Sequence, residues 1–214
     1  MPNLSISQLP ELLATGLTTT AEFAVAQAGV TYRIKNENLS PFSPVYGLFT
    51  QTGTSTTVSG TSEQSIINGG TGYLTVGANQ FKVGDTFHAV IRGHLSNNNN
   101  NMTIRVKGGG GSTVLADTGS INYNTSADNV LLSLDIYFII QSIGGAGSAQ
   151  ILTKGYLTTI KPSNFSVNGY AFEATNNTTF DTTVSNTLDV TWQFDATDAS
   201  TYVYSDLFTL VKLY

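Results

Sequence analysis

The sequence predicts an all-β protein, an antiparallel β-sandwich of jelly-roll type preceded by a short N-terminal β-hairpin arm. Thr, Gly, Ser and Asn supply 90 of the 214 residues, and these types favour strands and turns over helices. Hydrophobic residues make up 40% of the chain and charged residues 11%, so it can bury a core. Stretches of alternating apolar and polar residues recur between turn signals. A meander barrel would also bury one face of each strand and remains the alternative topology.

Composition excludes several classes of function. A net charge of −5 and a pI near 4.8 argue against nucleic-acid binding, which needs basic stripes. The chain has no cysteine, which excludes disulfides, zinc ribbons and thiol catalysis. The opening Met1-Pro2-Asn3-Leu4-Ser5 lacks the basic and apolar regions of a signal peptide, and no stretch approaches the roughly 18 apolar residues of a membrane helix. We therefore expect a protein made in the cytoplasm and not secreted.

Residues 1–40 predict an arm distinct from the rest. Two short alternating stretches flank Gln27-Ala28-Gly29, which closes a hairpin. A hairpin of this size is marginal alone, so we expect it to pack against another chain or the main domain. The two prolines of residues 41–44 mark the boundary, which gives an arm of residues 1–40 and a head domain of residues 41–214.

The first half of the head domain predicts three strands. Residues 50–62 are almost free of apolar side chains, which fits either an exposed strand or a loose loop, and we favour an edge strand. Residues 86–95 and 102–107 predict two further strands, joined by a hairpin tip at the asparagine run of residues 97–101. The glycine run of residues 108–111 then forms a flexible turn.

The second half predicts the central strand and its partners. Every even position from 130 to 140 is apolar, which is typical of a long strand with one buried face. Residues 149–158 predict its antiparallel partner, after a glycine-rich turn at residues 144–147. Residues 188–194 alternate in the same way, and residues 208–214 predict a final strand.

The candidates for metal or nucleophilic chemistry are weak. His88 and His94 are six residues apart on one strand, about 20 Å by strand rise, too far for one metal ion, so we interpret them as surface or interface residues. No Gly-x-Ser-x-Gly nucleophile elbow is present, and the glycine run lacks a phosphate-loop ending. The acidic C-terminal loops show no regular calcium-binding repeat. We expect no catalytic residue, no cofactor and no metal.

Asp189 and Asp195 flank Trp192, which raises the alternative of paired carboxylates beside an aromatic sugar platform. In a strand, both carboxylates share a side with Thr191 and Gln193, which favours a solvated face. Exposed tyrosines beside asparagines would also suit a surface that binds sugars without cleaving them.

Two parts of the chain resemble virion surface proteins. Ile6-Ser7-Gln8-Leu9-Pro10, followed by the hairpin that ends in Gly29-Val30-Thr31-Tyr32-Arg33-Ile34, resembles the opening of many bacteriophage tail-fibre proteins. The segments 81–86, 104–107, 176–182, 186–192 and 208–214 resemble the terminal head domain of phage and large-DNA-virus surface proteins. The resemblance implies a non-enzymatic virion protein, a homotrimer of jelly-roll heads that docks onto another virion protein through its N-terminal arm.

Within this resemblance we expect a short tail fibre or spike whose head contacts a host glycan or protein. The expected anchoring residues are Ile6, Leu9, Pro10, Phe23, Val25, Val30, Tyr32 and Ile34. The candidate host contacts are Asn97, Asn98, Asn99, Asn100, Asn101, Asn176 and Asn177, and the turn at residues 144–147 is a further candidate contact loop. No repetitive shaft occupies residues 40–70, which leaves a capsid decoration, cement or vertex protein as the alternative. A glycan-processing enzyme is the second alternative and is ranked last.

Overall fold

The computed structural model describes residues 22–27, 30–35, 46–67, 75–123, 126–161 and 167–213. The chain divides into two compact units, Met1–Pro44 and Val45–Tyr214. The boundary predicted from the sequence follows residue 40. The described residues form strands and one short 3-10 turn, and none of them belongs to a helix with the length and apolarity needed to cross a membrane.

The first unit contains an antiparallel pair of strands, β1 (Glu22–Gln27) and β2 (Val30–Lys35). Its register places Phe23 opposite Ile34 and Val25 opposite Tyr32. The predicted pair of strands is therefore confirmed. Ile6, Leu9 and Pro10, the other expected anchoring residues, lie outside the described part of the chain.

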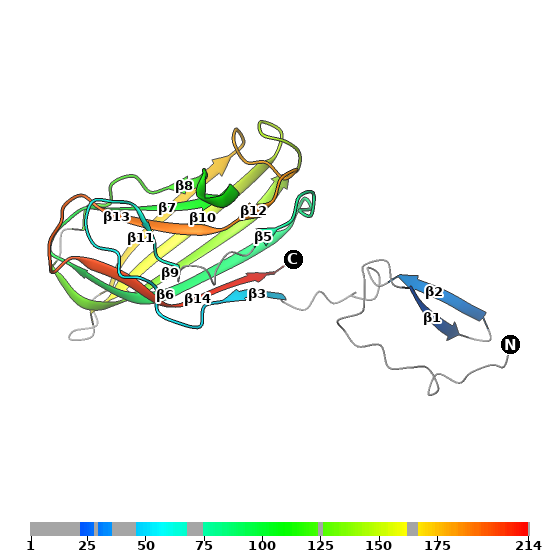
Figure 1. The fold of residues 1–214 in the computed structure, drawn as a ribbon, viewed down its shortest axis with the longest axis horizontal. Coiled ribbons are helices and arrows are strands. Elements are labelled where there is room, and N and C mark those ends of the chain that lie inside the picture. Colours follow the sequence, from blue (N-terminus) through cyan, green and yellow to red (C-terminus); the bar gives the residue numbers. More distant parts are fainter. Residues whose placement is uncertain are drawn as a thin grey trace. The chain divides into compact units, whose positions relative to one another are not determined.

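The second unit is built from two main antiparallel sheets and forms a β-sandwich, shown in Figure 1. The six-stranded sheet has the order β11 (Val167–Asn176), β10 (Gln150–Ile160), β9 (Ala127–Ser142), β6 (Thr86–Asn97), β14 (Tyr202–Lys212) and β3 (Tyr46–Thr50). The four-stranded sheet has the order β4 (Gln64–Ser65), β13 (Asp189–Phe194), β7 (Met102–Gly108) and β8 (Thr113–Asp117). A small third sheet pairs β5 (Thr75–Val76) with β12 (Asn186–Thr187).

The strand pairs are nested along the chain. β3 pairs with β14, β4 with β13, β6 with β9, and β7 with β8, all antiparallel. The chain therefore runs out through β3, β4, β6 and β7 and returns through β8, β9, β13 and β14, like one long hairpin. Successive pairs alternate between the two sheets, so this hairpin is wrapped over itself. β10 and β11 then extend the six-stranded sheet beyond β9.

The core lies between the two sheets and follows from the period of two in each strand. In β9 the even positions from Val130 to Ile140 are buried, as the sequence predicts, and the odd positions are half-buried or exposed. From the opposite sheet, Ile104 of β7 and Trp192 of β13 are fully buried. The predicted central strand and its antiparallel partner β10 are both confirmed.

The predicted hairpin tip at residues 97–101 is wrong. β6 pairs with β9 and β14, whereas β7 pairs with β13 and β8, so the asparagine run carries the chain from one sheet to the other. Local alternation identified both strands but carried no information about their partners, because pairing here is set by contacts distant in sequence.

The predicted edge strand over residues 50–62 is also wrong. Beyond β3, this segment follows β14 with separated backbone contacts, including the Ser55 amide to the Ser205 carbonyl (2.8 Å) and a single bridge between Val58 and Val203. Side chains replace the ladder bonds, since the Ser205 amide donates to the Ser55 hydroxyl (2.9 Å). The bulge in β14 between Ser205 and Leu207 interrupts regular pairing at the same place.

Two buried glycines, Gly93 and Gly108, differ in how much space surrounds them for a side chain. A Cβ on Gly93 of β6 would lie 2.0 Å from the Tyr204 carbonyl oxygen, which is backbone and cannot turn aside. A Cβ on Gly108 of β7 would lie 3.4 Å from Leu115 and 3.6 Å from Asn186, which is ordinary contact distance. Gly108 also lines a small apolar cavity of about 50 Å³ between the sheets, together with Phe138.

We expect Gly108→Ala to raise the free energy of unfolding by about 0.5–1 kcal/mol, because the methyl group fits beside the cavity and alanine restricts the unfolded chain. Gly93→Ala is the matched control and should lower it by about 2 kcal/mol or more, since two paired backbones must separate. Urea unfolding followed by circular dichroism measures both changes. A destabilised Gly108→Ala would show that this end of the core is fully packed.

Candidate binding surfaces

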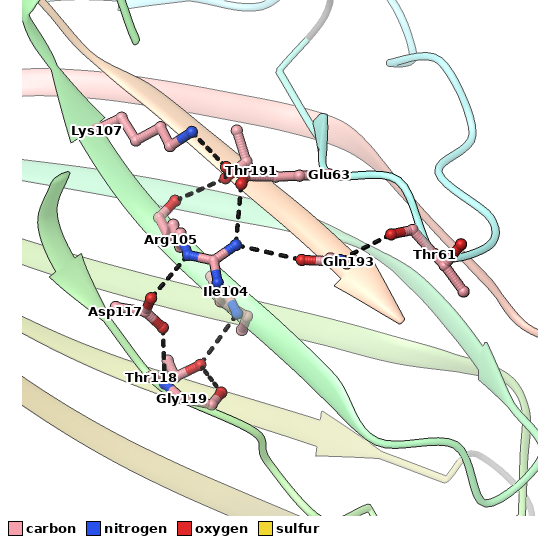
Figure 2. A network of polar contacts seen from close by, with 10 residues as sticks. All are labelled: Thr61, Glu63, Ile104, Arg105, Lys107, Asp117, Thr118, Gly119, Thr191 and Gln193. Carbon is pink, nitrogen blue, oxygen red and sulfur yellow. Dashed lines mark hydrogen bonds and ion pairs between the residues drawn. The ribbon is translucent and has the colours of Figure 1, made fainter. Parts of the chain in front are cut away.

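The outward face of the four-stranded sheet carries a charged network centred on Arg105 of β7 (Figure 2). Its Nε donates to Asp117 of β8 (2.7 Å), and its Nη1 donates to Glu63 (2.9 Å) and to Gln193 of β13 (3.2 Å). Glu63 also accepts from the Thr191 hydroxyl (2.6 Å) and pairs with Lys107. The network therefore ties β7, β8 and β13 to the segment that enters β4.

The charges of this network satisfy one another. Burial alone would raise the pKa of Glu63, but hydrogen bonds from Lys107 and Thr191 and the charge of Arg105 outweigh it, so the net pKa lies below its usual range. The hydrogen bond to Asp117 raises the pKa of Arg105 above its ordinary value. Because these groups bond one another, we interpret the network as a brace across the sheet and not as a binding site.

The outward face of the six-stranded sheet is different, and we call it the outer sheet face. It is formed by the odd positions of β9 and the positions paired with them. Its register aligns Val167, Ile160 and Leu131 across β11, β10 and β9. Leu131 is 49% exposed and Val167 60% exposed, and Tyr156 of β10 is 50% exposed. A solvated sheet face normally alternates to polar residues, whereas this one presents apolar side chains from three adjacent strands.

At the centre of the outer sheet face lies a half-buried polar cluster around Asp135 of β9. Its carboxylate pairs with Arg92 of β6 (3.1 Å) and with Nε2 of His88 (3.1 Å), and it accepts from the Ser133 hydroxyl (3.1 Å). Burial raises the pKa of Asp135, but the hydrogen bond and charge of Arg92, with the bonds from His88 and Ser133, lower it below its usual range.

The Asp135 cluster is not arranged as a catalytic triad. Ser133 and His88 both bond the carboxylate, whereas nucleophile activation requires the serine to bond the histidine. The His88 ring instead lies flat on Tyr137, with centroids 4.2 Å apart and planes 5° apart. His94 stacks in the same way on Tyr204 of β14, at 5.3 Å and 22°. Both histidines therefore lie on the outer sheet face, each paired with an aromatic ring.

A polar cleft of about 490 Å³ lies at the end of the sandwich where the asparagine run is found, and we call it the end cleft. Three segments line it: the end of β6, the start of β9 and the segment that enters β14. Their lining residues include Ser96, Asn98, Ser126, Asp128, Ser200 and Tyr202. No alternation within a single segment predicts this cleft, because the three segments lie far apart in sequence.

The asparagines of residues 97–101 have different environments. Asn97 is 1% exposed, and its side chain donates to the Asn100 carbonyl (2.8 Å) and accepts from the Asn100 amide (2.9 Å). It therefore closes the loop and offers no group to an external partner. Asn98 and Asn99 are exposed, and Asn98 lines the end cleft. The Asn101 amide donates to Asp195 (2.9 Å).

Asn176 ends β11, at the opposite end of the sheet from the asparagine run. Its Oδ1 accepts from the amides of Thr178, Thr179 and Phe180 at 3.0–3.2 Å, and its Nδ2 donates to the Val114 carbonyl (2.8 Å). Its side chain thus holds the following loop against β8. Asn177 is exposed beside it.

The structure does not form the sugar platform that the sequence suggests around Trp192. Trp192 is fully buried and cannot form a sugar platform. Asp189 accepts from Ser65 (2.5 Å), and Asp195 accepts from the Asn101 amide, so each carboxylate has a local structural role. Over the described residues, no group of three or more His, Asp or Glu side chains is placed to hold a metal ion.

Comparison with known proteins gives little information. No family model matches the chain, and no curated protein matches it. Among solved structures, the insecticidal delta-endotoxin Cry8Ea1 of Bacillus thuringiensis aligns with a TM-score of 0.33 and 16% identity. The alignment covers 74% of this chain and 19% of the toxin chain. A TM-score of this size does not establish a shared fold.

We expect Arg105→Met to lower the free energy of unfolding by about 1 kcal/mol, because Asp117 and Glu63 lose charged donors that are partly screened by solvent. Lys82→Met is the control, since Lys82 is exposed in the loop before β6, away from both outward sheet faces, and should contribute little. Thermal unfolding of both variants measures the difference. Equal effects would contradict the role of Arg105 as a brace.

We expect Asp135→Asn to destabilise the protein by about 1 kcal/mol near neutral pH, through the weakened bond to Arg92. Because the folded pKa of Asp135 is lowered, its contribution is present above the unfolded value of about 3.9 and is lost as the pH falls through the folded pKa. Urea unfolding between about pH 5 and pH 2 tests this. A stability difference that stays constant over this range would contradict the pairing.

Proposed function

We propose that this protein is a non-enzymatic structural protein of a virion surface, and that its sandwich units associate as a homotrimer through the outer sheet face. The observation that carries the proposal is the row of apolar residues formed by Val167, Ile160 and Leu131. Tyr156 is exposed on the same face, opposite Asp135. Contiguous exposed apolar residues on a sheet are typical of protein interfaces. The Asp135 carboxylate at its centre is paired with Arg92 and His88, so burial of this face would not leave that charge without a partner.

We also propose that the sandwich is of the jelly-roll type. Without β10 and β11, its strands form the orders β3-β14-β6-β9 and β4-β13-β7-β8. The nested pairs and their alternation between sheets support this interpretation, since a jelly roll is a long hairpin wrapped into two sheets. Jelly rolls occur in viral capsid and lectin domains, but a fold alone does not define a function. The proposal therefore rests first on the outer sheet face.

Residues 1–40 are proposed as the virion anchor. The resemblance of Ile6-Ser7-Gln8-Leu9-Pro10 and the following hairpin to tail-fibre openings supports this role. The β1–β2 pair has six residues in each strand, and a two-stranded pair of this size is marginal in water without a partner. Docking onto another virion protein would supply that partner. The role proposed for the whole chain is thus a short tail fibre or spike whose head contacts the host surface.

A capsid decoration or cement protein is the second candidate. The sequence between residues 40 and 70 has no repetitive shaft, which favours this role over a long fibre. The two candidates differ in what the head binds. Retention on host cells favours the fibre, whereas binding to emptied capsids without retention on cells favours the decoration protein.

The mass of the full chain in solution tests the proposed interface. We expect light scattering to give a mass three times that of the 22.7 kDa chain, and Leu131→Glu to shift the protein to the monomer by placing a charge in the apolar row. Val83→Glu is the matched control, because Val83 is 61% exposed in the loop before β6. It should leave the trimer intact.

Circular dichroism of the variants separates dissociation from unfolding. A wild-type monomer, or a Leu131→Glu variant that stays trimeric with a native spectrum, would overturn the assignment of the outer sheet face.

A further inference from the structure

The end cleft has the chemistry of a site for an uncharged polar ligand. Its described lining residues supply the Ser126 hydroxyl, the Asn98 side-chain carbonyl and the Asp128 carboxylate. The Asn98 Nδ2 and the Ser200 side chain, which also line the cleft, bond Asp198. No lysine, arginine or histidine is among these lining residues. A phosphate, sulfate or sialic acid would therefore meet a carboxylate without a compensating cation. The lining favours a ligand that offers many hydroxyl groups and no negative charge.

We propose that the end cleft binds one neutral saccharide unit of a host-surface glycan. This inference rests on the proposed host-contact role and gives it a ligand class. The volume of about 490 Å³ lies within the usual range of roughly 300–1,000 Å³ for small-molecule sites. Sugars combine hydroxyl groups with an apolar C–H face, so a site for them needs hydrogen-bonding groups beside an aromatic ring.

Tyr202 supplies that ring. It lies at the start of β14 and lines the cleft. Its ring stacks on Tyr204, with centroids 6.3 Å apart and planes 12° apart, and Tyr204 stacks in turn on His94. This series of rings fixes the orientation of Tyr202 before any ligand arrives, which lowers the entropy cost of binding.

The rest of the cleft is also held in place by internal bonds. Thr201 accepts from the Asn98 amide (3.2 Å) and from the Asn100 side chain (2.9 Å), so the asparagine run is fixed to the segment that enters β14. The Asn129 amide donates to the Ser96 hydroxyl (2.8 Å), which joins β9 to the end of β6. The three lining segments therefore form one preformed frame.

Asp128 is the group best placed to select the ligand. It is exposed at the start of β9, and no hydrogen bond or ion pair joins its carboxylate to another described residue. A carboxylate accepts from two adjacent sugar hydroxyls through its two oxygens. Among the described lining residues Asp128 alone carries a carboxylate. Asp198 lies next to the cleft, but its carboxylate accepts from the Asn98 side chain (3.0 Å) and from the Ser200 amide (2.7 Å). Glycoside hydrolysis uses a pair of carboxyl groups that face the substrate, so the site is assigned to binding and not to cleavage.

Saturation-transfer NMR on the full-length protein tests this inference. The neutral probes are the methyl glycosides of galactose, mannose and N-acetylglucosamine, and the anionic probe is the methyl glycoside of N-acetylneuraminic acid. We expect at least one neutral probe to bind with a Kd on the order of 1 mM and the anionic probe to give no transfer.

Asp128→Ala and Tyr202→Ala should each weaken binding of that neutral probe at least about tenfold, while Tyr202→Phe, which keeps the ring, should retain it. Asp181→Asn is the carboxylate control, because its neighbour Thr182 bonds Gly144 at the opposite end of β9. It should bind as the wild type does.

Three results would overturn the inference: no transfer to any neutral probe, preference for the anionic probe, or equal binding by Asp128→Ala and the wild type. The mass of each sample is measured alongside. If the protein forms its trimer but binds no neutral probe, the proposed saccharide site is wrong and the proposed interface is still supported. If the protein is a monomer and binds a neutral probe, the proposed interface is wrong and the proposed saccharide site is still supported.

Discussion

The two-residue period of the strands is the constraint on which the rest of this structure depends. Each central strand gives every second side chain to the space between the sheets, so half of its residues are committed to the core. In β9 that half runs from Val130 to Ile140, and in β13 it includes Trp192. Side chains that contact a partner therefore lie on the outward faces of the sheets or in the loops at the two ends of the sandwich.

The outward faces of the two sheets carry different kinds of side chain. On the four-stranded sheet the groups around Arg105 bond one another and brace the strands. On the six-stranded sheet the corresponding positions include Leu131 and Tyr156, which remain exposed although they lie beside the half-buried Asp135 cluster. On the outward face of the four-stranded sheet the charged groups are therefore paired with one another. On the outward face of the six-stranded sheet, no described residue covers the exposed apolar side chains. This asymmetry, and not the fold class, is the basis on which we propose assembly through the outer sheet face.

Much of the fold was predictable from the sequence, because it follows from local alternation. β9, β10, β7 and the β1–β2 pair are evident from apolar residues at every second position. β11 was missed, since it contains Gly169 and polar residues on a sheet edge, which blur its alternation. β4, β5 and β12 have two residues each and give no periodic signal. The nested pairing of β3 with β14 joins the two ends of the domain, and no local pattern encodes it.

The candidate surfaces were only partly predictable for the same reason. The asparagine run was identified as a contact loop, but the burial of Asn97 depends on its fold-back to Asn100. Leu131 lies in a strand that the sequence predicts, but only the pairing of β9, β10 and β11 in the structure places Ile160 and Val167 beside it. The end cleft brings together residues near 97, 128 and 202. Because these residues are far apart in sequence, no pattern within one segment predicts the cleft.

A crystal structure of the full-length protein at the concentration where it assembles would show directly which surface lies between the copies. We predict three copies around one axis, with Leu131, Ile160 and Val167 buried between neighbouring sandwiches and the end cleft open to solvent. A monomer, or an assembly in which this row stays exposed and another surface is buried, would contradict it.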